Sequence, residues 1–114
     1  MSIGIDPKEY IDVDDALRRV GGNMNLYRRL LGRFADSDQY APLEEALRNG
    51  NTAEAGRLAH TLKGVSANLS LVKVKDLSAD LDLLIKNGAD HAAVLDELKL
   101  AYGVTLQVIA EILN

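Results

Sequence analysis

Apolar residues in this chain recur at helical spacing in one segment after another, and no segment alternates apolar and polar residues as a half-buried strand would. Short links containing Gly or Asn-Gly separate these segments. Short links between long amphipathic helices favour antiparallel neighbours. The sequence therefore predicts an all-α fold: an up-and-down antiparallel four-helix bundle with a short N-terminal helix and a kinked second helix, in a single domain over residues 1–114.

Residues that begin and end helices set the expected boundaries. Residues 1–11 show no clear period, and Gly4 and Pro7 predict an extended lead-in there. Asp12 is placed to cap the short helix, which Gly21 and Gly22 end, because Gly tolerates the left-handed conformation at a helix stop.

The later helices have similar signals. Asn23, Thr52 and Asp90 are predicted N-caps, and Asn87-Gly88 is a predicted stop. Pro42 removes a backbone donor, so we expect a kink in the second helix, with a true break as the alternative. The expected ranges are about 24–49 for the second helix, then 52–70, 72–87 and 91–113.

The helix expected over residues 52–70 has two contrasting sides. One narrow stripe is apolar and is expected to face the core. The opposite side holds one imidazole, one ammonium and residues with almost no side chain. An outward glycine in mid-helix costs about 1 kcal/mol relative to Ala, so Gly64 is best explained as clearance for a large partner close to the imidazole. The stripe is Leu58, Leu62, Val65 and Leu69, and the opposite set is His60, Lys63, Gly64 and Ala67.

This helix carries the motif His60-Thr61-Leu62-Lys63-Gly64, followed by Ala67-Asn68-Leu69, which resembles the phosphorylation motif of histidine phosphotransfer (HPt) domains. The resemblance covers about residues 12–88 by pattern and the last helix by length. Members of that family often carry Gly at the place of Ser70. HPt domains are four-helix carriers of phosphorelays, so the resemblance implies a phosphorylated histidine. It also implies a response-regulator receiver domain, a hybrid sensor histidine kinase, or both as partners.

The chemistry of each residue on the exposed side suggests its role. Imidazole can act as a neutral nucleophile near pH 7, so His60 is the predicted phosphorylation site. Lys63 lies one turn further on and would act as a point charge on the bound phosphoryl group. The predicted partner-docking residues around them are Gly56, Gly64, Ala67 and Asn68.

Composition and motifs argue against several other functions. The formal net charge of −4 is not that of a nucleic-acid binder. The chain has no Cys, its two His residues are at unrelated positions, and no phosphate-binding loop motif is present, so we expect no metal, no cofactor, no ATP site and no enzyme activity of its own. No apolar run has the length of a membrane span, which favours a cytoplasmic protein without membrane insertion. A monomer is expected, because the apolar stripes already have partners within the bundle.

Two functions remain open. The first is a phosphocarrier that docks receiver domains through the His60 side. The alternative is a non-catalytic helical adaptor that binds receiver or kinase domains through the same face. The retained nucleophile favours the carrier. His91 follows Asp90 without a Lys-Gly companion, so it is expected to be only solvated.

Overall fold

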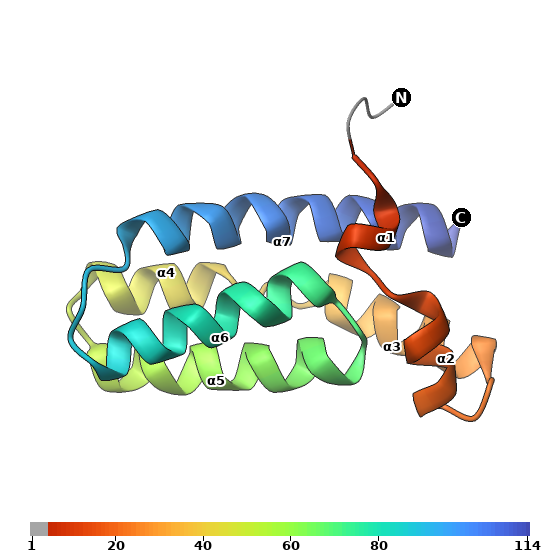
Figure 1. The fold of residues 1–114 in the computed structure, drawn as a ribbon, viewed down its shortest axis with the longest axis horizontal. Coiled ribbons are helices and arrows are strands. Elements are labelled where there is room, and N and C mark those ends of the chain that lie inside the picture. Colours follow the sequence, from red (N-terminus) through yellow and green to blue (C-terminus); the bar gives the residue numbers. More distant parts are fainter. Residues whose placement is uncertain (1–4) are drawn as a thin grey trace.

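The computed structural model describes residues 5–114, and every regular element among them is an α-helix, as predicted. In Figure 1, α5, α6 and α7 lie alongside one another, and α3 and α4 follow each other along the remaining side. The helices are α1 (Pro7–Tyr10), α2 (Val13–Arg19), α3 (Met24–Asp36), α4 (Ala41–Arg48), α5 (Thr52–Asn68), α6 (Val72–Lys86) and α7 (Ala92–Leu113).

The lead-in that was expected to be extended contains the short helix α1, so that prediction is wrong for residues 7–10. Asp6 caps this helix, because its side chain accepts a hydrogen bond from the backbone N of Lys8 at 3.0 Å. Pro7 is the first helical residue, where its fixed φ suits the turn and its missing N–H has no partner to lose. Residues 1–4 of the predicted lead-in lie outside the described residues.

The caps predicted for the next two helices are confirmed. The side chain of Asp12 accepts a hydrogen bond from the backbone N of Asp15, and that of Asn23 accepts one from the backbone N of Leu26, both at 3.0 Å. Gly21 follows α2 with a φ of +64°, which explains why the chain needs a glycine at this stop.

The second helix is broken rather than kinked, so the single helix expected over 24–49 is wrong and its alternative is right. The backbone of Ser37 is extended, with φ −120° and ψ 115°. Asp38 then turns the chain, because its side chain accepts hydrogen bonds from the backbone N of Tyr40 at 2.9 Å and of Ala41 at 3.0 Å. A side chain that satisfies backbone donors in this way stabilises a turn against a continuous helix.

Two further residues explain why the break persists. Pro42 lies in the first turn of α4, where a proline is well tolerated, so it begins a new helix instead of bending an old one. From α7, the hydroxyl of Tyr102 accepts a hydrogen bond from the backbone N of Gln39 at 2.9 Å. The break is therefore tied to the last helix of the chain.

Helix α5 begins and ends close to its expected limits. Asn51, rather than Thr52, is the N-cap, because the side chain of Asn51 accepts a hydrogen bond from the backbone N of Glu54 at 3.2 Å. At the other end Ser70 has a φ of +57°, in the left-handed region that favours glycine. The last helix α7 begins at Ala92, so its N-cap is His91 and not the predicted Asp90, although the side chain of Asp90 accepts a hydrogen bond from the backbone N of Ala92 at 3.1 Å.

An N-terminal clamp, defined by Asp12, Asp15 and Tyr27, holds this end of α5. The backbone N of Asp12 donates to the carbonyl of Ser70 at 3.0 Å, and the hydroxyl of Ser70 donates to the carboxylate of Asp15 at 2.7 Å. The buried hydroxyl of Tyr27 donates to the carbonyl of Leu69 at 2.8 Å. Burial, with a smaller effect from Asp12, raises the pKa of Tyr27 to about 12, so this hydroxyl keeps its proton at neutral pH.

The buried side of α5 differs from the expected leucine stripe. Its fully buried residues are Ala55, Ala59, Leu62 and Ser66, whereas Leu58 and Val65 are only partly buried. At 100° per residue, this line is rotated by about 60° from the predicted stripe. The rotation turns the alanines inward, and it places His60 at the edge of the exposed side that borders α6.

Candidate functional site

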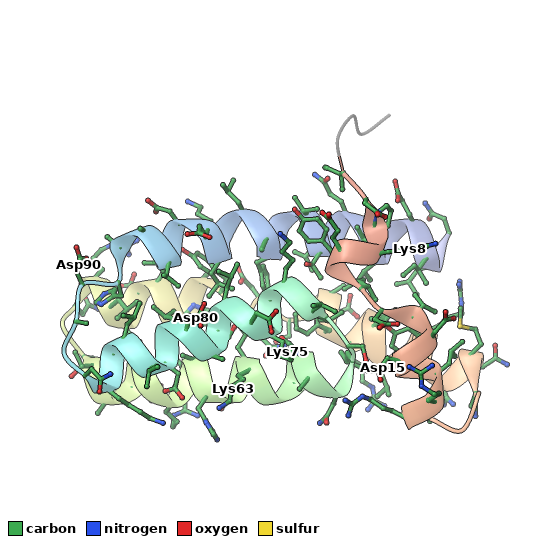
Figure 2. All side chains as sticks on the ribbon, viewed as in Figure 1. Lys8, Asp15, Lys63, Lys75, Asp80 and Asp90 are labelled. Atoms are coloured by element: carbon green, nitrogen blue, oxygen red, sulfur yellow. The ribbon has the colours of Figure 1, made fainter. Side chains whose placement is uncertain are left out.

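The outer side of α5 carries the residues that the sequence singled out. The side chain of His60 is 67% exposed, and Gly64 is exposed one turn further on. A Cβ atom built at Gly64 would meet nothing within 4 Å. Lys63 is half-buried on the same helix, and Figure 2 labels it on α5. The surface around the imidazole is therefore clear of side chains on the side toward Gly64.

The direction of helical side chains relates these residues to one another. Cα–Cβ bonds tilt toward the N-terminus of a helix, so a side chain covers the turn that precedes it. We therefore expect the imidazole of His60 to lean over Gly56 and the ammonium of Lys63 to lean back toward His60. Gly56 is half-buried, and a Cβ there would lie 3.8 Å from a methyl group of Ile85, an ordinary contact.

A buried carboxylate, which was not predicted from the sequence, lies behind the imidazole. Oδ2 of Asp82, on α6, is 3.8 Å from Nδ1 of His60. Asp82 is only 3% exposed, and its other oxygen, Oδ1, is buried without a hydrogen-bond partner. Lys86, one turn along α6, places its Nζ 3.2 Å from the same Oδ2. The surface around His60 thus includes an acidic and a basic side chain, Asp82 and Lys86, from a second helix.

One sequence signal could have found Asp82. In an antiparallel helical hairpin, residues at equal distances from the link face each other. The link between α5 and α6 is residues 69–71, centred on Ser70, and His60 and Asp82 lie at similar distances from it, ten residues before and twelve residues after. An aspartate opposite a candidate nucleophile is therefore visible in the sequence once the hairpin is assumed.

A hollow of about 560 Å³ opens between α5 and α6 beside this group. Gly56 and Ile85 line it together with His60, Asp82 and Lys86. Arg57 also borders it, but its guanidinium is held by Glu54 through hydrogen bonds of 2.7 and 2.8 Å.

Asn68 and Ala67 lie further along α5. Ala67 is half-buried and Asn68 is exposed. Asn68 borders a separate hollow of about 650 Å³, whose walls include Phe34 of α3 and Val65. The structure therefore groups His60, Lys63, Gly56 and Gly64 around one stretch of α5, and Asn68 faces a different depression.

His91, the comparison histidine, has different surroundings. It is partly buried just before α7, and its Nδ1 lies 3.3 Å from the carbonyl oxygen of Ala89. Over residues 5–114, no group of three or more His, Cys, Asp or Glu side chains is arranged to hold a metal ion. In the same range, no helix combines the length and apolarity needed to cross a bilayer.

A family model with the description Hpt domain matches residues 36–110, a range that includes α4, α5, α6 and most of α7. His60, Lys63 and Asp82 all lie inside this range. No curated protein and no solved structure matches the chain.

Proposed function

Because this chain belongs to the Hpt domain family, whose members serve phosphotransfer in two-component signalling, we propose that it carries a phosphoryl group on His60. The group would come from a hybrid sensor histidine kinase or from the phosphorylatable aspartate of a receiver domain. It would pass to the phosphorylatable aspartate of a response-regulator receiver domain. The observation that best supports this proposal is the pairing at His60: the imidazole is exposed on a cleared surface, and a buried carboxylate lies behind its Nδ1.

The carboxylate of Asp82 suggests which nitrogen reacts. A movement of about 1 Å would bring Nδ1–H of His60 within hydrogen-bond distance of Oδ2 of Asp82. With the proton held on Nδ1, the lone pair of Nε2 remains free on the other side of the ring. Nε2 is therefore the nucleophile of the proposal, and Asp82 is a positioning residue.

The proposed transfer step is a direct displacement at phosphorus. Nε2 of His60 attacks the phosphorus of the partner's aspartyl phosphate, an N–P bond forms, and the P–O bond to the aspartate breaks. The aspartate leaves with the electron pair of that bond as a carboxylate. The same steps in reverse return the group to a second aspartate. Lys63 supplies positive charge to the phosphoryl oxygens.

The partner would contribute what this chain does not supply in the proposal, namely the metal ion and the acidic site of the receiver. Gly56, Gly64 and Ala67 would form the flat docking area around His60, with Asn68 at its edge. We also propose that the fold is a four-helix bundle in which α3 and α4 together occupy one helix position. The carrier would act as a monomer, in the cytoplasm with its partners.

The test is transfer of radiolabelled phosphate from a phosphorylated receiver to this chain. The parent should acquire label that is labile in acid and stable in base, as expected for an N–P bond. His60→Gln should acquire none and should keep the helical circular dichroism of the parent, because position 60 is exposed. His91→Gln is the matched control and should label normally. Label that is lost in His91→Gln and kept in His60→Gln would overturn the assignment. Normal signalling by His60→Gln would favour the adaptor.

A further inference from the structure

Asp82 is a buried charge that needs a partner. It is 3% exposed, and its Oδ1 makes no hydrogen bond. An isolated carboxylate in such a place is strongly disfavoured, so its charge must be neutralised through Oδ2. Stabilisation of this carboxylate thus depends on the groups that reach one oxygen atom.

Two donors compete for that oxygen. Nζ of Lys86 lies 3.2 Å from Oδ2, close to hydrogen-bond distance, whereas Nδ1 of His60 lies 3.8 Å away, beyond it. A charged ammonium is the stronger partner of a carboxylate than a neutral imidazole N–H. Lys86 therefore holds Asp82 in the unphosphorylated protein, and the imidazole is left partly free.

Lys86 is well placed to leave. It is the last residue of α6, its side chain is 63% exposed, and it borders the hollow beside His60. Its pair with Asp82 is the one salt bridge that it makes within residues 5–114. Arg57, the other cation at this hollow, is bound on both sides of its guanidinium fork by Glu54. The side chain of Lys86 can therefore move away by breaking its salt bridge with Asp82 alone, whereas Arg57 would have to break two hydrogen bonds to Glu54.

Phosphorylation of Nε2 would change the balance at Oδ2. When Nε2 of the Nδ1–H tautomer takes the phosphoryl group, the ring becomes an imidazolium cation, and its one remaining N–H, at Nδ1, is a charged donor facing Asp82. The phosphoryl group also adds negative charge close to the hollow and attracts an ammonium. Both changes favour His60 over Lys86 as the partner of Asp82.

We propose that Lys86 is a mobile counter-ion, a positioning residue that neutralises Asp82 while His60 is unphosphorylated and yields Oδ2 to the Nδ1–H of phosphohistidine. The inference deepens the proposed function and rests on it for the phosphorylated state. Its first half concerns the unphosphorylated protein alone. By withholding Asp82 from the resting imidazole, Lys86 would limit the fraction of His60 that has its proton on Nδ1.

The first experiment measures the tautomer of His60 in the unphosphorylated protein from its imidazole ¹⁵N chemical shifts. Lys86→Gln removes the charge and should shift His60 toward the Nδ1–H tautomer, because Asp82 loses its stronger partner. Lys86→Arg keeps the charge and should match the parent. His91 is the internal control and should not change. An unchanged His60 tautomer in Lys86→Gln would overturn the inference.

The second experiment uses the parent protein, so it holds even if Lys86→Gln fails to fold. Phosphoramidate, a small phosphoryl donor to imidazole, replaces the protein partner, and NMR follows the ammonium of Lys86. On phosphorylation of His60 its salt-bridge signal should be lost, and Nδ1–H should become protected from exchange. If His60 is phosphorylated and the Lys86 bridge persists, the inference is wrong while the proposed function stands. If phosphate appears on His91 instead, the proposed function fails, and the tautomer measurement still decides the first half.

Discussion

Replacing Gly64 with Gln tests whether this glycine is needed to leave space for a partner or to stabilise the fold. Position 64 is helical and exposed, and a Cβ atom there would meet nothing within 4 Å. Gln is a better helix former than Gly by about 0.5 kcal/mol. The free energy of unfolding should therefore stay level or rise by that amount, which corresponds to an increase in Tm of about 2 °C for a domain of this size.

Transfer should respond in the opposite direction. A side chain at position 64 leans toward the N-terminus of α5, and so toward the turn that carries His60. It would stand between the imidazole and the partner's phosphoryl group. A misplacement of about 1 Å can cost about 10²-fold in the rate of an oriented reaction. Gly64→Gln should therefore slow transfer from a receiver by about two orders of magnitude.

The assay is a thermal melt and a phosphotransfer time course on the same samples. Gly103→Gln is the matched control, because Gly103 is also helical and exposed, with nothing within 4 Å of a Cβ, and it lies on α7. It should keep both the Tm and the transfer rate. If Gly64→Gln unfolds the domain or transfers at the parent rate, or if Gly103→Gln slows transfer equally, the clearance argument is refuted.

Two further predictions address acid stability and assembly. Hydrogen bonds from Ser70 and then Arg19 hold the pKa of Asp15 below its usual 3.8, so its contribution to stability is present above that value and is lost as the pH falls through the lower, folded-state pKa. In urea titrations, Asp15→Asn should lose less stability than the parent between about pH 6 and about pH 3, and an equal loss would contradict this reasoning. Sedimentation should show a monomer, whereas a stable dimer that buries His60 would argue against it.

Local signals in the sequence were sufficient for several parts of the fold. The caps Asp12 and Asn23 act on backbone donors three residues ahead, so their function depends on nothing distant. The all-helical class followed from the period of the apolar residues. The prediction that Thr52 caps α5 was wrong by one residue. Its neighbour Asn51 is the N-cap, and both residue types cap helices well.

The break between α3 and α4 depends on contacts that the local pattern does not contain. Pro42 suggested a kink, although a proline suits the first turn of a new helix equally well. Asp38 gives a local turn, but the hydroxyl of Tyr102 that holds Gln39 comes from the other end of the chain. The choice between a kink and a break therefore needs the tertiary fold.

The part of the candidate site on α5 could be proposed from local spacing, whereas the part on α6 could be proposed only by assuming the α5–α6 hairpin. His60, Lys63 and Gly64 share one helix, so their spacing alone relates them. Asp82 was missed because an aspartate is ordinarily a surface residue, and its burial depends on how α5 packs against α6. That packing turns Ala59 inward, a rotation that the leucine pattern did not predict.

The N-terminal clamp bears on how this domain could be transplanted into another protein. The family match begins at residue 36, yet Asp12, Asp15 and Tyr27 bind Leu69 and Ser70, the two residues that follow α5. A graft cut at residue 36 would leave the left-handed Ser70 and the carbonyl of Leu69 without these partners. A graft that keeps α5 intact should therefore begin before Asp12, well upstream of the segment by which the family is identified.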